Sequence, residues 1–544
     1  MFTTKYDEKN KVWSGLDIPP TYNSKISVAQ VMLNALKTYG SKIAQISDND
    51  GIELSFNEIR QKTIRAAENL LDRGYKPKQV FGLMAKNSHH VAPIVFGSIS
   101  IGCPVNTLDP SFKKAELIHM LITIKPVLMF CDVGVYDLVS ECLAELKNDA
   151  KIFTFGGSKG KAEPVEKLLL ETHNEDYFVP MEVDGEKETA LIICSSGTTG
   201  FSKGVCLSHA ALLDEMAHLS FTYSSDVMLC FSTLYWITGV ITLFKGTMCG
   251  ATRIITTESY SPELQLHLFE QYKVTWALNA SHHLLLMMKN KNFTTTDLSS
   301  IRCQFVTGSK VPLHVQSEMS SHLPNGNVSV VYGLSETCGP VSGDYPQPSG
   351  RDCVGRLLSG VKIKVIDDQG NRCGPNVDGE VCIKVNYRFL GYYGNQDATD
   401  ELFDDEGCLM TGDIGHFDSM GYLYIVDRKK DLLKYYGNSI SPSEIDAFLI
   451  QSPKIKSACI VGIPDEVASD LPAAVIVCAD GAHISEQEIF DMVADNFSDH
   501  CKLRGGVYFV DSLPSTVSGK VLRRKVKEIA IQLFENGNTE LCRS

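Results

Sequence analysis

Short apolar runs alternate with longer amphipathic segments along most of the chain. The runs at 124–132, 189–196 and 328–333 have the length and apolar character of buried strands. The segments AELIHMLITI and SPELQLHLFEQY are longer, and their apolar residues have the spacing of helices. This alternation predicts a layered α/β architecture.

The pattern changes after Val361, where short alternating strands such as VKIKVID and GEVCIKV are separated by turns rich in Gly and Pro. Such a texture predicts a small β-barrel or sandwich. Farther on, ACIVGIPDE, PAAVIVCAD and GVYFVDSLP predict three strands, with the helix SEQEIFDMVADNF between the last two. We expect this last region to be a compact α+β unit of about 110 residues, a usual domain size.

Size and charge limit the classes of function. A chain of 544 residues exceeds the size at which one hydrophobic core keeps growing, so we expect at least two domains. The hydrophobic fraction of 44% and the charged fraction of 21% are those of an ordinary globular protein. The net charge of -14 disfavours nucleic acid and anionic membranes as partners, so a polyanionic ligand must meet a local basic cluster.

Several other classes of site are also disfavoured. The apolar stretch 91–108 is interrupted by Pro93, Gly97, Gly102 and Pro104, which predicts a buried helix and turn and no transmembrane segment. The 17 cysteines are odd in number and form no C-x-x-C pair, so we interpret them as reduced, mostly buried thiols. The N-terminus has no apolar segment of the kind that a secretory signal needs, which indicates an intracellular protein.

The stretch CSSGTTGFSKGV at 194–205 is the first candidate for chemistry. Its glycines let the backbone turn its N–H groups inward, its hydroxyls can donate to phosphate oxygens, and its lysine adds a positive charge. The spacing differs from a Walker A loop, which requires G-x-x-x-x-G-K-[ST]. The composition therefore predicts a phosphate-binding loop of another kind.

This loop resembles the phosphate loop of the adenylate-forming superfamily, which contains acyl- and aryl-CoA synthetases, beetle luciferases and peptide-synthetase adenylation domains. The matching positions are Ser195, Ser196, Gly197, Thr198, Thr199, Gly200, Lys203 and Gly204. Further signatures follow in family order over roughly residues 20 to 525, among them the segment 332–337, YGLSET. The resemblance implies that Tyr332 stacks on adenine beside Gly333, that Ser335 touches the phosphate, and that Glu336 helps to hold Mg²⁺.

Other residues of the resemblance lie toward the C-terminus. It implies that Asp413, in Thr411-Gly412-Asp413, accepts hydrogen bonds from the ribose hydroxyls and that Arg428 is its partner. It places a hinge at Lys430, and Lys434 on a segment that swings in for the second half-reaction. Lys520, in the segment LPSTVSGK, would enter the active site during adenylation, where a mobile ammonium bridges two anions as charge builds up.

The resemblance also implies the domain organisation. We expect residues 1–429 to form an N-terminal ATP- and acyl-binding domain, made of two layered α/β subdomains and a small β-barrel. Residues 430–544 would form a small, mobile α+β C-terminal domain. Basic residues at 523–527 could meet the phosphates of coenzyme A or form a solvated helix face.

The reaction that the resemblance implies has two steps. A carboxylic acid, most simply a medium- or long-chain fatty acid, and MgATP give an acyl-adenylate and pyrophosphate; coenzyme A then takes the acyl group and AMP leaves. Lys520, Glu336, Lys434 and Thr198 are the residues expected to act in catalysis. The alternatives are a luciferase-like monooxygenase that acts through an adenylate, and an adenylate-binding protein with weakened catalysis.

Two positions depart from the family pattern. Trp236 replaces the histidine at the carboxylate end of the acyl pocket, so it either gates that pocket or blocks it. Lys310 replaces a small residue near the same pocket, where it would pair with a substrate carboxylate or point to solvent. The terminal Cys542-Arg543-Ser544 resembles the peroxisomal S-K-L signal at two positions only, which leaves the cytoplasm and the peroxisome as alternatives.

Overall fold

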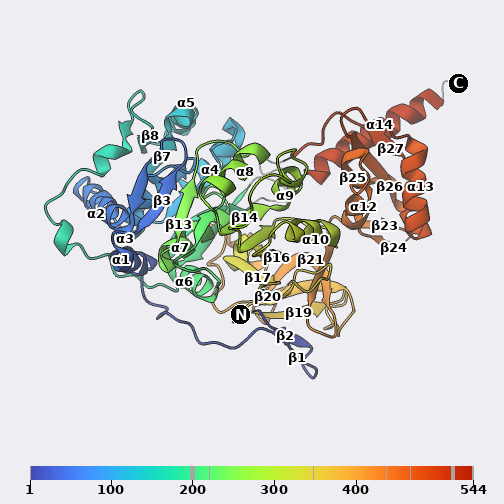
Figure 1. Ribbon diagram of the computed structural model, residues 1–544, viewed down its shortest axis with the longest axis horizontal. Helices are drawn as coiled ribbons and strands as arrows, with labels where there is room; N and C mark the ends of the chain where they lie inside the picture. The colour runs from blue at the N-terminus through green and yellow to red at the C-terminus, as the bar shows by residue number, and fades with distance from the viewer. Residues whose placement is uncertain are drawn as a thin grey trace.

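The computed structural model describes residues 2–195, 202–219, 221–346, 348–436, 438–465, 467–515 and 521–541, with residues 439 and 536–541 described by their backbone alone. A large N-terminal domain carries three sheets, and a small C-terminal domain lies to one side of it, at the right of Figure 1. This arrangement confirms the expected α/β class with two domains of unequal size.

The first sheet has seven strands, and all neighbouring strands are parallel except β10 and β11. Its central strands are buried on both faces, as their continuous apolar sequences require. The strand order is β11 (Lys203–Ser208), β10 (Thr189–Ser195), β6 (Val105–Thr107), β5 (Phe81–Met84), β7 (Leu128–Asp132), β8 (Lys151–Phe155) and β9 (Glu163–Pro164).

The second sheet has nine strands, and its middle is parallel from β16 through β3. The strand order is β18 (Arg356–Leu357), β17 (Gly339–Gly343), β16 (Asn327–Leu334), β15 (Cys303–Thr307), β14 (Trp276–Ala280), β12 (Val227–Leu229), β13 (Thr252–Ile255), β3 (Ile43–Ser47) and β4 (Glu53–Ser55). The carboxyl ends of β14, β15 and β16 therefore share one edge, which is where open α/β sheets bind ligands.

Helices form a layer between these two sheets. Helices α1 (Val28–Tyr39), α2 (Phe56–Asp72), α3 (Val91–Ser100) and α7 (Ile237–Cys249) pack on one another, with α3 against β6 and α7 against β12 and β13. Every residue of α3 is buried, which confirms a buried helix in the stretch 91–108. Among the described residues, no helix is both long enough and apolar enough to cross a membrane. The other helices of this domain are α4 (Lys114–Ile124), α5 (Tyr136–Glu145), α6 (His209–His218), α8 (Pro262–Gln271), α9 (Ser281–Met288), α10 (Leu313–Ser321) and α11 (Gln396–Asp400).

The third sheet joins the N-terminal hairpin to the strands predicted after Val361. Its order is β1 (Lys5–Asp7), β2 (Val12–Ser14), β19 (Lys362–Ile366), β20 (Gly379–Lys384), β21 (Leu409–Phe417) and β22 (Leu423–Arg428). In the described part of the chain β1 and β22 are the edges, so the expected small β-barrel is an open sheet. Closure would need these edges to pair, but β1 is a short exposed strand and β22 leads into the C-terminal domain.

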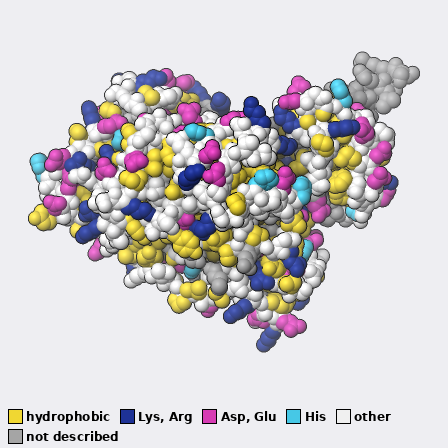
Figure 2. All heavy atoms as spheres, in the orientation of Figure 1, with side chains coloured by type: hydrophobic (Ala, Val, Ile, Leu, Met, Phe, Trp, Pro, Cys, Tyr) yellow, Lys and Arg dark blue, Asp and Glu magenta, His cyan; other side chains and the backbone are white. Residues whose placement is uncertain are grey.

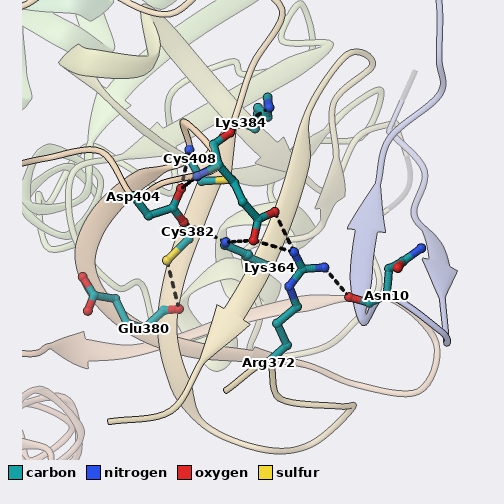
Figure 3. A network of polar contacts seen from close by, with 9 residues as sticks. Asn10, Lys364, Arg372, Glu380, Cys382, Lys384, Asp404 and Cys408 are labelled. Carbon is teal, nitrogen blue, oxygen red and sulfur yellow. Dashed lines mark hydrogen bonds and ion pairs between the residues drawn. The ribbon is translucent and has the colours of Figure 1, made fainter. Parts of the chain in front are cut away.

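Ion pairs tie this sheet together, and a hydrogen bond joins it to the N-terminal hairpin (Figure 3). Lys364 Nζ lies 2.8 Å from a carboxylate oxygen of Asp404 and 2.8 Å from one of Glu406. Arg372 pairs with Glu406 at 2.6 Å and donates to the carbonyl oxygen of Asn10 at 2.6 Å. Since Lys364 is buried, these carboxylates replace the water that would otherwise solvate its charge.

The C-terminal domain is an α+β unit with its own hydrophobic clusters, as predicted. Its sheet has the order β24 (Asn438–Ile440), β23 (Leu433–Tyr435), β26 (Ser469–Cys478) and β25 (Ile455–Asp465), and β27 (Val507–Phe509) also pairs with β26. Its helices are α12 (Pro442–Leu449), α13 (Glu486–Asn496) and α14 (Arg523–Leu541). Every described cysteine of the chain is a free thiol, and all except Cys249 and Cys478 are buried, which confirms the interpretation of the cysteines.

Candidate active site

A cavity of about 2000 Å³ lies where the three sheets of the N-terminal domain and the C-terminal domain meet. The carboxyl ends of β14, β15 and β16 contribute part of its wall. Acidic and basic side chains are interspersed over the face of the molecule shown in Figure 2. The cavity lining carries both signs of charge: its basic side chains include Lys86, Lys203, Lys289, Lys310, Arg428 and Arg523, of which the last three pair with carboxylates.

The phosphate-loop candidate is the turn of a hairpin between β10 and β11. Ser195 at the end of β10 pairs with Lys203 at the start of β11, and both side chains line the cavity. The hydroxyl of Ser195 donates to the carbonyl oxygen of Lys203 at 3.5 Å. Ser196, Gly197, Thr198, Thr199 and Gly200 lie outside the described residues, so the structure places only the two ends of the loop.

Tyr332, Asp413 and Arg428 meet on one wall of the cavity. The Tyr332 hydroxyl donates to Asp413 Oδ2 at 2.5 Å, and Arg428 Nε lies 2.5 Å from Asp413 Oδ1. Asp413 and Arg428 face each other because β21 and β22 pair them directly. Burial raises the pKa of Tyr332 well above its usual value, and the nearby Asp413 carboxylate raises it further, so the hydroxyl remains a donor. Three positions far apart in the sequence thus form one polar network.

Gly333, Ser335 and Glu336 follow at the end of β16. A Cβ on Gly333 would lie 2.1 Å from the carbonyl oxygen of Gly339, so glycine is required for the close approach of β16 and β17. Ser335 and Glu336 belong to a short 3-10 helix at Ser335–Thr337, and both line the cavity. The local fold therefore presents the Glu336 carboxylate beside the phosphate-loop hairpin.

Tyr392 is a site residue that the sequence reasoning missed. Its hydroxyl donates to Glu336 Oε1 at 2.7 Å, and Lys203 Nζ lies 4.7 Å from the centroid of its ring. Tyr392 also lines the cavity. The segment LGYYGN gave no chemical signal, since it carries no charged residue and tyrosine is intermediate in its preference for burial.

Trp236 lines the cavity at the N-terminus of α7. Its ring packs edge-on against Tyr235, with ring centroids 4.8 Å apart. Phe231, Tyr260 and His283 form an aromatic cluster in the same region, in which the Tyr260 and His283 rings stack at 3.5 Å. Burial lowers the pKa of His283 to about 3, so this ring is neutral at physiological pH.

Lys310 also lines the cavity, but its ammonium already has a protein partner. Lys310 Nζ lies 2.9 Å from Asp352 Oδ2, and Asp352 lines the cavity as well. The sequence had suggested either a substrate carboxylate or solvent as the partner. The structure gives a third outcome, an ion pair across the pocket wall.

The link between the domains runs from β22 into β23. Lys430 lies in this link and Lys434 on β23, where its backbone N–H donates to Asp470 Oδ2 at 3.1 Å. Across the link, Asp427 Oδ2 accepts hydrogen bonds from the Ser441 hydroxyl and the Ser443 N–H, each at 3.0 Å. Lys520 lies outside the described residues.

Arg523 was considered as a contact for the phosphates of coenzyme A, but it is held inside the C-terminal domain. Its guanidinium lies 2.8 Å from Asp446 Oδ2 and 3.3 Å from the Ser443 hydroxyl. Burial raises the pKa of Asp446 to about 6, although Arg523 partly opposes that rise. Arg524 lies 3.5 Å from Glu528 and Lys527 lies 3.5 Å from Asp470, so the basic cluster is divided among separate acidic partners.

Comparison with known proteins assigns this arrangement to a family. The family described as AMP-binding enzyme matches residues 33–393, and the AMP-binding enzyme C-terminal domain matches residues 444–520. The chain belongs to the adenylate-forming enzymes. Within this superfamily it falls in the luciferase-like branch, which also contains coumarate–CoA ligases.

The relatives of this adenylate-forming enzyme cover nearly its whole length. It is 30% identical to luciferin 4-monooxygenase of Luciola mingrelica, over 96% of this chain and 98% of the relative. It is 27% identical to 4-coumarate–CoA ligase-like 1 of Arabidopsis thaliana, over 97% and 98%. The structure of ATP-bound MatB from Rhodopseudomonas palustris superposes with a TM-score of 0.84 at 22% identity, covering 94% of this chain and 100% of that one, which shows a shared fold.

The residues present fit a magnesium ion carried in with ATP. Among the described residues, no group of three or more His, Cys, Asp or Glu side chains could hold a metal ion by itself. Mg²⁺ is commonly bound by one or two carboxylates, with phosphate oxygens and water completing its shell. Glu336 would supply such a carboxylate, because it lines the cavity and Tyr392 donates to only one of its two oxygens, Oε1.

Proposed function

We propose that the protein activates a carboxylic acid with ATP and transfers the acyl group to coenzyme A. A carboxylate oxygen attacks the α-phosphorus, and the bond from that phosphorus to pyrophosphate breaks. The thiol sulfur of coenzyme A then attacks the acyl carbon and loses its proton, and AMP leaves with the original carboxylate oxygen. The observation that carries the proposal is the Tyr332–Asp413–Arg428 network. It lies on the wall of a cavity that also reaches Trp236 and α9.

The nucleotide would be held by residues of all three sheets. Asp413 accepts the ribose hydroxyls and is held by Arg428, while Tyr332 and Gly333 border the adenine. The phosphates would meet Ser335, Lys203, Ser195 and the loop residues Ser196, Gly197, Thr198, Thr199 and Gly200. Glu336 would hold Mg²⁺, which when bound neutralises charge that builds up on the phosphates.

The C-terminal domain would alternate between the two half-reactions. We assign the boundary to residues 429 and 430, with Lys430 as the hinge. Lys520 would stabilise the charge that develops as the carboxylate attacks the α-phosphorus, and Lys434 would face the active site after rotation. The position of Lys434 on β23, outside the cavity lining, is consistent with a segment that must swing to reach the site.

For the acid, we propose a medium- or long-chain fatty acid. Leu285, Leu286 and Met288 of α9 line the cavity together with Trp236, which gives the acyl region an apolar wall. An indole has one donor and no acceptor, so Trp236 packs against the acid and cannot supply the charge-assisted bond of a histidine. We favour Trp236 as a gate and not as a plug, because one cavity extends from the wall that carries Tyr332 and Asp413 to α9.

Two other functions have specific support. The identity to the Luciola luciferin 4-monooxygenase favours a monooxygenase that acts through an adenylate. The Trp236 substitution favours a protein that binds nucleotide with little turnover.

AMP release with coenzyme A and a panel of fatty and aromatic acids separates these candidates. We expect AMP to form only when acid and coenzyme A are both present, with the highest rates for fatty acids. Trp236→His should shift the chain-length preference more than the maximal rate, and Trp236→Phe serves as the control that keeps a flat ring. ATP binding without AMP from any acid, together with activity gained in Trp236→His, would show a plug. Light with luciferin and oxygen would show a monooxygenase.

A further inference from the structure

The chain segment that carries Tyr392 runs alongside β11, which is the second strand of the phosphate-loop hairpin. Leu390 N–H donates to the Cys206 carbonyl oxygen at 2.8 Å, and Cys206 N–H donates to that of Gly391 at 3.0 Å. Tyr393 N–H donates to the Gly204 carbonyl oxygen at 2.8 Å. The backbone N–H of Tyr392 itself donates to Thr399 Oγ1 at 2.8 Å. These bonds on both sides fix the backbone from which the Tyr392 side chain projects.

The Tyr392 side chain touches two groups of opposite charge. Its hydroxyl donates to Glu336 Oε1 at 2.7 Å, and the Lys203 ammonium lies 4.7 Å from its ring centroid. The residue is 9% exposed, so water competes weakly for either contact. Burial and the Glu336 carboxylate both raise the pKa of Tyr392, which keeps the hydroxyl protonated as a donor.

The two charged groups keep separate contacts. In the described part of the chain no ion pair joins Lys203 to Glu336, and Tyr392 contacts both. A direct pair would neutralise the ammonium that a phosphate needs and the carboxylate that a cation needs. The aromatic ring gives the ammonium a neutral support, and the hydroxyl holds one carboxylate oxygen.

We propose that Tyr392 is a positioning residue that holds the Glu336 carboxylate for the Mg²⁺ of MgATP and the Lys203 ammonium for its phosphates. The proposal rests on the proposed function for the roles of Glu336 and Lys203. The two parts of the side chain have separable effects. The hydroxyl governs the dependence on magnesium, whereas the ring governs the affinity for the phosphates with or without the metal.

Two substitutions separate these effects. Tyr392→Phe keeps the ring under Lys203 and removes the bond to Glu336, so affinity for ATP with Mg²⁺ should fall about three- to tenfold. Affinity for ATP in the presence of a chelator should stay within about twofold of the wild type. Tyr392→Leu removes both contacts and should weaken ATP binding under both conditions.

Calorimetric titration of the full chain with ATP, with Mg²⁺ and with a chelator, tests the proposal without requiring turnover. Tyr393→Phe is the matched control, because this neighbouring tyrosine lines a separate depression beside Ile124 and should bind as the wild type does. The magnesium concentration that half-saturates pyrophosphate exchange should rise in Tyr392→Phe and should stay unchanged in Tyr393→Phe. A merely structural role would lower affinity equally with and without metal.

Equal metal-free and metal-dependent losses in Tyr392→Phe, or no loss in either, would overturn the proposal. Measurements on the wild type distinguish a failure of the proposed function from a failure of the positioning role. Wild-type protein that binds MgATP more tightly than ATP, yet activates no acid, would contradict the proposed reaction while the Tyr392 variants still test the positioning role. Wild-type protein that binds ATP with no dependence on Mg²⁺ would contradict both.

Discussion

At the scale of single residues, Asp413 is central to the polar network on the cavity wall because it accepts from Tyr332 and pairs with Arg428. Asp413→Asn removes the negative charge and one acceptor while keeping the size of the side chain. We expect affinity for AMP to fall about tenfold to a hundredfold, the scale of lost charge-assisted bonds. Calorimetric titration with AMP measures the change.

Asp418→Asn is the control for that experiment. Asp418 lies just after β21 on the same sheet and pairs with Arg351 at 3.4 Å, away from the cavity lining. The variant should bind AMP as the wild type does. Equal losses in both variants would indicate a general effect on the sheet and would argue against Asp413 as a ribose contact.

His209 predicts a pH dependence of stability. It is buried, its Nδ1 accepts from the Val28 N–H at 3.2 Å, and burial lowers its pKa to about 4 from an ordinary 6.5. The unfolded state therefore binds more protons between these two values. The free energy of unfolding therefore falls by up to about 3 kcal/mol as the pH falls from 6.5 toward 4, and above that window His209 adds no pH dependence.

His209→Gln should flatten the pH dependence of the free energy of unfolding in that window by about one bound proton. Denaturant unfolding at a series of pH values measures it, with His173→Gln at an exposed position as the control. An unchanged slope in His209→Gln would mean that another group carries the acid sensitivity.

At the scale of elements, one strand and one helix are joined across the link between the domains. Asp427 on β22 accepts from Ser441 and Ser443 at the start of α12, and rotation about Lys430 would break both bonds. Asp427→Ala should therefore loosen the orientation seen here. We expect backbone amides at 441–446 to exchange with solvent about tenfold faster, while those of β25 and β26 keep their protection.

Glu444→Ala is the matched control, since it also removes one negative charge near the N-terminus of α12 but keeps both bonds to Asp427. Hydrogen exchange read by mass spectrometry follows both variants. An exchange rate at 441–446 that is unchanged in Asp427→Ala, or that rises equally in Glu444→Ala, would contradict the claim that the bonds to Asp427 hold the two domains in this orientation.

The helices and strands themselves were largely predictable from the sequence. The run 189–196 contains β10, which ends at Ser195, and the segment 261–272 contains α8, because apolar periodicity reflects burial within one element. The prediction of a β-barrel was wrong, because the third sheet does not close in the described part of the chain. Whether a sheet closes depends on the partners of its edge strands, and β1, from the start of the chain, forms an edge beside strands from much later in the sequence.

At the scale of the whole molecule, the site was predictable only where the sequence carries a contiguous signature. Lys203, Glu336, Asp413 and Arg428, which the family resemblance singled out, line one cavity. The partners of these residues were not predictable, because the contact of Tyr392 with Glu336 and that of Lys310 with Asp352 arise from packing between distant segments. No local pattern of residues encodes such pairs.

The central claim is that a carboxylate oxygen attacks ATP at the α-phosphorus, displaces pyrophosphate and becomes part of an acyl-adenylate. A fatty acid labelled with heavy oxygen in both carboxylate positions tests it most directly, because attack joins one of these oxygens to phosphorus. After turnover with ATP and coenzyme A, mass spectrometry of the AMP should find one heavy oxygen per phosphate and none in the pyrophosphate. AMP without the label, or the label in pyrophosphate or inorganic phosphate, would contradict the account.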